Sequence, residues 1–165
     1  MNSHMIDSLS ITTIEHPSAR QQRSVIRRLV SYNDLWAGPE RFIRFAVLLH
    51  DRRRRLVGGL LASTHWQWLF ISHLWIDETV RRQGYGTQLL LKAEAEARSR
   101  GCKHAYLDTF SFQARGFYEA HGYQIFGELH DFPVGHTRHF LWKLHLDDAA
   151  GPPEPQSPQP AESIR

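Results

Sequence analysis

A loop near the middle of the chain carries the strongest chemical signal in the sequence. Arg81, Gly84 and Gly86 form an Arg-x-x-Gly-x-Gly pattern between an apolar segment and a long amphipathic one. Where a strand passes into a helix, the free backbone N–H groups of the first helical turn and the helix dipole both attract an anion. Glycines let a phosphate approach the backbone closely, and arginines add charge-assisted hydrogen-bond donors. The pattern therefore predicts a phosphate-binding loop.

Two other phosphate-binding motifs do not fit this loop. A dinucleotide-binding fingerprint needs a third glycine three residues after Gly86, where the chain has Leu89. A P-loop needs Gly-Lys-Ser or Gly-Lys-Thr, which the chain lacks. The alternative to a phosphate site is that Gly84 and Gly86 only permit a tight turn between a strand and a helix.

A second segment, further along the chain, has the pattern of a short helix with an aromatic face. Ala114, Phe117, Tyr118 and His121 recur at helical spacing, and Gly122 ends the pattern. Because positions separated by three and four residues share one face of a helix, this pattern predicts that Ala114 and Tyr118 lie on the same face.

Together, the two segments resemble the GNAT superfamily of acetyl-CoA-dependent N-acyltransferases. The glycine loop resembles the family's pyrophosphate loop. The later segment resembles the family's short helix, in which an alanine, a tyrosine four residues on and a Gly-aromatic pair recur. Ala114, Tyr118 and the pair Gly122-Tyr123 match that pattern, whereas Ser111 stands where the family often has an asparagine.

The resemblance implies that acetyl-CoA binds as a co-substrate, without a metal. Backbone amides of the strand before the loop would bind the cofactor and its carbonyl, and the loop would hold the pyrophosphate. The cofactor-binding residues implied in this way are Leu74, Trp75, Ile76, Arg81, Arg82, Gln83, Gly84, Tyr85, Gly86, Thr87, Ala114 and Phe117.

Acetyl transfer to an amine needs two proton transfers. A protonated alkylamine, with a pKa of about 10.4, must lose a proton before it can attack, and the departing thiolate must gain one. By resemblance, Tyr118 is the group that protonates the thiolate; the alternative is an aromatic residue that only packs in the core. Glu78, just past the strand, is the predicted catalytic base. His73, Asp108 and a chain of water molecules remain alternatives for that role.

The hydrophobic periodicity predicts an α/β (α+β) fold with a mixed, mostly antiparallel central sheet flanked by helices. Alternating or β-branched segments predict strands, and i, i+3, i+4 spacing predicts helices. Glu94 and Glu96 are expected to pair with arginines four residues on, on the solvent side of the second helix. The strands are expected at residues 10–14, 42–50, 56–63, 68–76, 104–110, 123–129 and 140–146, and the helices at 19–36, 86–97 and 114–121.

This order of elements matches the GNAT family over nearly all of residues 11–146. The resemblance implies that the sheet opens into a V where the strand at 68–76 parts from the strand at 104–110. The split would expose backbone groups to which an extended ligand could bind as an added strand.

Composition excludes several classes of protein. The 165 residues include 41% hydrophobic ones, which excludes a wholly disordered chain, and no apolar run is long enough to span a bilayer. Cys102 is the only cysteine, so neither an intrachain disulfide nor a cysteine-based zinc site is possible. His130, His136 and His139 match no zinc-binding spacing, and no metal site is predicted.

The net charge of +3 comes partly from a run of four arginines at 52–55. The favoured interpretation of this run is a solvated turn between two strands, and the alternative is a surface that binds a polyanion such as nucleic acid. Residues 1–5 are interpreted as a tag remnant, residues 6–148 as a single acetyltransferase domain, and the proline-rich residues 149–165 as a disordered tail.

The favoured hypothesis is a cytoplasmic enzyme that acetylates a primary amine of a small molecule by direct attack in a ternary complex. A protein or nucleic-acid acetyltransferase and a non-catalytic acyl-CoA-binding module are the alternatives. No membrane partner is expected, a nucleic-acid partner is disfavoured, and a homodimer is left open.

Overall fold

The computed structural model describes residues 9–146, which form parts of two compact units, residues 1–40 and 41–165. The expected tag remnant and the proline-rich tail lie outside the described residues. Among those that are described, no helix combines the length and the apolar composition that crossing a membrane requires.

The first unit contains one helix, α1 (Ala19–Ala37). Ser18 and Gln21 form a capping box at its start, as the sequence predicts, and Gly38 ends it with a φ of 72°. The expected strand at 10–14 is wrong, because these residues have no regular structure. Ile11 is fully exposed, and without a partner strand the segment lacks both the ladder hydrogen bonds and the packing that stabilise a strand.

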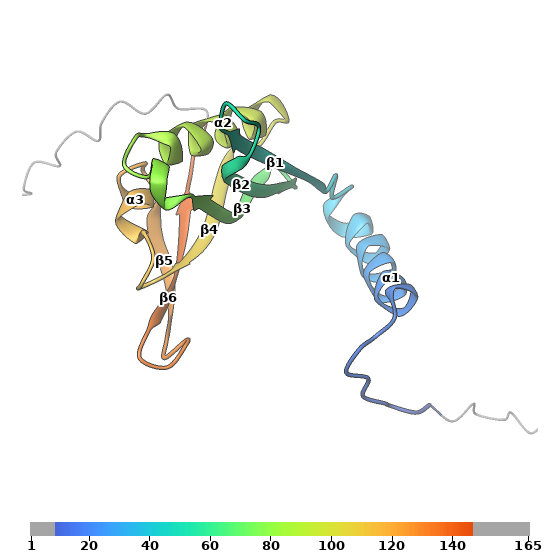
Figure 1. Ribbon diagram of the computed structural model, residues 1–165. Coiled ribbons are helices and arrows are strands. Elements are labelled where there is room, and N and C mark those ends of the chain that lie inside the picture. The colour runs from blue at the N-terminus through green and yellow to red at the C-terminus, as the bar shows by residue number, and fades with distance from the viewer. Residues whose placement is uncertain (1–8, 147–165) are drawn as a thin grey trace, which may run out of the picture. The chain divides into compact units, whose positions relative to one another are not determined.

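The second unit contains a six-stranded sheet with the strand order β1-β2-β3-β4-β6-β5 (Figure 1). All neighbouring strands are antiparallel except β3 and β4, which are parallel, so the mixed, mostly antiparallel sheet is confirmed. The elements are β1 (Ile43–His50), β2 (Leu56–His65), β3 (Trp68–Ile76), the 3-10 turn η1 (Glu78–Val80), α2 (Tyr85–Ser99), β4 (His104–Phe110), α3 (Arg115–Glu119), β5 (Gln124–His130) and β6 (Thr137–Lys143).

Strands β3 and β4 pair only at their N-terminal ends. The pairing runs from Trp68 with His104 to Ile71 with Leu107 and stops there. On its other edge β3 pairs with β2 along its whole length, but a register shift leaves Ser72 as an extra residue. Such a β-bulge bends a strand and increases its twist. It lies where β3 leaves β4, and the expected V-shaped opening is confirmed.

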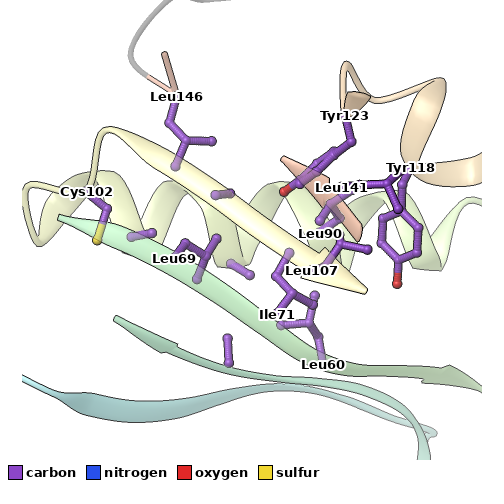
Figure 2. Packing of buried hydrophobic residues seen from close by; sticks show 14 of the residues in the cluster. Leu60, Leu69, Ile71, Leu90, Cys102, Leu107, Tyr118, Tyr123, Leu141 and Leu146 are labelled. Carbon is purple, nitrogen blue, oxygen red and sulfur yellow. The ribbon is translucent and has the colours of Figure 1, made fainter. Parts of the chain in front are cut away.

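The core lies between α2 and the sheet (Figure 2). Helix α2 packs against β1, β2 and β3. Its apolar face follows the predicted spacing, with Leu89, Leu90, Ala93 and Ala97 buried. Gly101, with a φ of 81°, follows the helix as the expected left-handed residue.

Glu94 departs from the expectation of a solvent-facing residue. Its side chain is almost fully buried, because Lys143 of β6 reaches both carboxylate oxygens, at 2.9 and 3.1 Å, and the Tyr123 hydroxyl donates to it at 3.1 Å. The expected partner, Arg98, lies 4.0 Å away. By contrast, Glu96 and Arg100 form the expected pair at 2.6 Å.

The last strand begins and ends earlier than predicted. β6 occupies Thr137–Lys143 rather than 140–146, because it pairs with β4 from Arg138 to Lys143. His145, with a φ of 59°, then turns the chain, and the Leu146 N–H donates to the Lys103 carbonyl.

The arginine run forms the turn between β1 and β2. The carboxylate of Asp51 accepts hydrogen bonds from the backbone N–H groups of Arg53 and Arg55 and from the Arg55 side chain. These contacts stabilise a turn at the arginine run, in agreement with the favoured interpretation.

Candidate active site

A cavity of about 690 Å³ opens where β3 and β4 part. Its walls come from the C-terminal half of β3, the loop before α2, the first turn of α2, the end of β4, and α3. The predicted site residues that line it are Leu74, Trp75, Ile76, Arg81, Arg82, Gly84, Tyr85, Gly86, Thr87, Ala114, Phe117 and Tyr118. His73 and Asp108, the alternative candidates for the base, line it as well.

The structure does not bring Glu78 or Gln83 into this lining. The side chain of Glu78 is 85% exposed on η1 and pairs with Arg81 at 3.4 Å. The side-chain amide of Gln83 donates instead to the Thr79 carbonyl at 3.4 Å. Both side chains therefore contact the loop itself, and neither residue lines the cavity.

The loop before α2 has the backbone shape of an anion site. Arg82 and Gly84 both have positive φ values, 60° and 80°, and no side chain caps the N-terminus of α2. The N–H groups of the first helical turn therefore remain available to a negatively charged ligand. The Arg81 side chain secures the loop to β3, because its Nε donates to the Ile76 carbonyl at 3.0 Å.

Helices α2 and α3 meet beside this loop. The His121 Nδ1 lies 2.7 Å from the Phe117 carbonyl, and its Nε2 lies 3.1 Å from the Thr87 hydroxyl. Since a carbonyl can only accept, Nδ1 carries the proton, and in the neutral ring Nε2 accepts from Thr87. His121 lies in the turn after α3, 34 residues from Thr87, so local spacing in the sequence does not predict this contact.

Tyr118 lies on α3 with only 9% of its surface exposed. Its ring packs against the rings of Phe117 and Tyr123 at centroid distances of 5.1 and 5.9 Å. The hydroxyls of Tyr118 and Tyr123 point in different directions (Figure 2). Burial raises the pKa of Tyr118 above its usual value, and the charge of Asp108 raises it further. The hydroxyl therefore stays protonated at neutral pH and can act as a donor.

Asp108, near the end of β4, forms an ion pair with Arg138 of β6. The Arg138 Nε donates to Asp108 Oδ2 at 2.7 Å, and this hydrogen bond raises the pKa of the guanidinium. The guanidinium carbon lies 5.3–5.4 Å from the ring centroids of Phe110, Phe132 and Phe140. Cation–π attraction to three rings holds the arginine in place.

Ser111, which departs from the family pattern, ties the end of β4 to the β5–β6 hairpin. Its hydroxyl accepts from the Thr137 N–H at 3.2 Å and lies 3.2 Å from the His136 Nδ1. Its own N–H donates to the Thr137 carbonyl at 2.8 Å. Ser111 does not line the cavity.

The β5–β6 hairpin carries His130, His136 and His139, and Glu128 lies 2.7 Å from His139 and 4.0 Å from His130. His136 lies against Ser111, and His130 lies 3.4 Å from the Thr137 hydroxyl. Across residues 9–146, no group of three or more potential ligands could hold a metal ion.

Comparisons with known proteins agree with this geometry. The model of the acetyltransferase (GNAT) family matches residues 9–123. Blasticidin-S acetyltransferase of Streptomyces morookaense is 40% identical over 60% of this chain and 74% of its own length. Acetyltransferase Atu2258 of Agrobacterium fabrum is 32% identical over 76% of this chain and 91% of its own.

A crystal structure of an acetyltransferase from Bacillus cereus superposes with a TM-score of 0.72. It is 32% identical, and the match covers 81% of this chain and 97% of that one. The open sheet, the uncapped helix after a glycine loop and the family match lead to one conclusion: the chain belongs to the GNAT family of acetyltransferases and is an acyltransferase enzyme.

Proposed function

We propose that this enzyme transfers the acetyl group of acetyl-CoA to a primary amine of a small molecule, by direct attack in a ternary complex. The observation that carries the proposal is that the anion-binding loop, the unpaired edge of β3 and the hydroxyl-bearing Tyr118 all line one cavity. Its volume is within the range of small-molecule sites. The activity of the blasticidin-S relative favours a small-molecule acceptor over a protein.

The residues of the cavity fit acetyl-CoA. Uncapped N–H groups at the start of α2, together with Arg81 and Arg82, suit a pyrophosphate. Beyond Ile71, the edge of β3 that faces β4 is unpaired, so the backbone groups of Leu74 and the N–H of Ile76 can hydrogen-bond an extended amide-containing arm. The backbone of Trp75, between them, faces Gly59 of β2. The bound co-substrate supplies a thioester, which is an activated acyl donor.

Side chains of the protein then carry out the two proton transfers. Tyr118 donates its hydroxyl proton to the sulfur that leaves, and its raised pKa means that this proton is present at neutral pH. The amine must lose a proton before it attacks, and the two candidate acceptors in the lining are His73 and Asp108. Glu78 remains a candidate only through a water molecule or a movement of η1.

The proposal is tested by incubating the purified enzyme with acetyl-CoA and a panel of amines. The panel is blasticidin S, spermidine and 2-phenylethylamine, with free thiol and acetylated product both measured. We expect thiol release that depends on an amine and matches product formation. Tight calorimetric binding of coenzyme A without transfer to any amine would instead support a non-catalytic binding module.

A further inference from the structure

Asp108 has a particular place in the cavity. Within residues 9–146, it is the only carboxylate that lines the cavity. Since Leu107 is the last residue of β4 to pair with β3, Asp108 lies at the apex of the V. The loop with Arg81 and Arg82 follows the far end of β3, five residues beyond Ile71. Five residues of strand span roughly 16 Å at about 3.3 Å per residue, so the start of this loop lies well away from the apex of the V.

The carboxylate of Asp108 is held in place, and it can still accept another hydrogen bond. Oδ2 accepts from Arg138, and Oδ1 has no hydrogen-bond donor among the described residues. A carboxylate oxygen offers about two acceptor positions, so Asp108 can bind a further N–H group. Its side chain is 21% exposed, which leaves it accessible yet partly shielded from water.

Arg138 cannot easily turn away from Asp108. The three phenylalanines around its guanidinium come from β4, β6 and the hairpin between β5 and β6. They hold the guanidinium beside Oδ2 and leave the other oxygen of the carboxylate free. A cation that enters the cavity can therefore bind Asp108 without displacing Arg138.

We propose that Asp108 recognises the positively charged amine of the acceptor and that Arg138 is the residue that positions Asp108. This inference rests on the proposed function and adds the class of acceptor: a small primary alkylamine that binds as its ammonium ion. The charge-assisted hydrogen bond to Oδ1 holds the ammonium at the apex, next to Tyr118. The co-substrate's phosphates bind at the opposite, cationic region.

The first test is Asp108→Asn, which keeps the shape of the side chain and removes its charge. At saturating acetyl-CoA, we expect KM for the most responsive amine of the panel to rise roughly 10- to 150-fold, with kcat changed by far less. Calorimetric affinity for coenzyme A should stay unchanged. Arg138→Gln should raise KM as well, and Arg138→Lys should recover part of the loss.

Asp51→Asn is the matched control. Asp51 also pairs with an arginine at 2.7 Å, but in the β1–β2 turn, away from the cavity. This variant should leave KM unchanged. Unchanged amine KM in Asp108→Asn would overturn the inference, and so would a loss confined to kcat, which would mark Asp108 as a proton acceptor instead.

A binding measurement separates this inference from the proposed function. If the wild-type enzyme acetylates no amine of the panel, the proposed function fails, but recognition can still be measured. Titration of 2-phenylethylamine and of its neutral analogue 2-phenylethanol into the coenzyme A complex compares a charged with an uncharged ligand. Asp108 recognition predicts tighter binding of the amine, lost in Asp108→Asn; equal binding of both ligands by the wild type would refute it.

Discussion

A Cβ atom added to Gly86 would lie 3.4 Å from Cε2 of Phe117, so the first turn of α2 and helix α3 meet at this glycine. Gly84 has a different requirement. Its φ is 80°, a left-handed conformation, and an added Cβ would meet nothing within 4 Å. Gly84 therefore provides a backbone angle, whereas Gly86 provides space next to an aromatic side chain that lines the cavity.

Gly86→Val should push the Phe117 ring into the cavity and weaken binding of coenzyme A by roughly tenfold or more. Gly84→Ala should strain the loop by about 1–2 kcal/mol without a steric clash. Calorimetry with coenzyme A and melting curves measure both effects. Gly116→Val is the control, because Gly116 lies on α3 with open space around it. Equal affinities of Gly86→Val and wild type would show that this contact does not shape the site.

Tyr118→Phe removes a hydroxyl and almost no volume. If this hydroxyl protonates the leaving thiolate, kcat should fall by roughly 10²–10⁴-fold, while affinity for coenzyme A and the melting temperature stay close to wild type. Tyr123→Phe is the comparison, because its hydroxyl hydrogen-bonds Glu94 in the core. That variant should lose stability and keep its turnover. Near-normal turnover in Tyr118→Phe would make Tyr118 a packing residue.

Local patterns were sufficient to predict most of the fold. The strands at 68–76 and 104–110 and the helix around Leu89 and Leu90 follow directly from hydrophobic periodicity. The segment at 10–14 is rich in β-branched residues, yet it has no partner strand. The composition of a segment gives its propensity to form a strand, but the strand forms only where a neighbouring strand is present to pair with it.

Contacts between distant segments could not be predicted. The spacing of Glu94 and Arg98 fits a surface ion pair. The carboxylate of Glu94 instead pairs in the core with Lys143, which lies 49 residues further along the chain. The pairing of Asp108 with Arg138 and the bridge from His121 to Thr87 depend in the same way on how β6 and α3 lie against their neighbours. The place of Glu78 just after the strand favours it as the base, but the turn at η1 leaves its side chain exposed to solvent.

The buried position of Glu94 predicts a large difference between two glutamates on the same helix. Glu94→Gln leaves the Lys143 ammonium without its buried partner, and breaking such a pair costs about 3–5 kcal/mol. Glu96→Gln breaks a more exposed pair and should cost less than about 1 kcal/mol. Urea unfolding of both variants gives the two values. Similar losses for both would mean that Glu94 is hydrated in solution.

Stability should also fall in alkaline solution because of the core tyrosines. Burial raises the pKa of Tyr123 well above its usual value, and the charge of Glu94 and the hydrogen bond to it raise it further; the pKa of Tyr118 is raised by burial and by Asp108. In the unfolded chain both ionise near pH 10. The contribution to stability is therefore complete below about pH 10 and is lost as the pH rises above that value towards the folded-state pKa values.

This pH dependence can be assigned to one residue. Urea midpoints measured from pH 8 to pH 11 should decline above about pH 10 in the wild type. Tyr123→Phe should start from a lower midpoint at pH 8, because the hydrogen bond to Glu94 is gone, and should decline less steeply above pH 10. Parallel declines in the two proteins would mean that other groups, such as lysines that lose their charge, cause the alkaline unfolding.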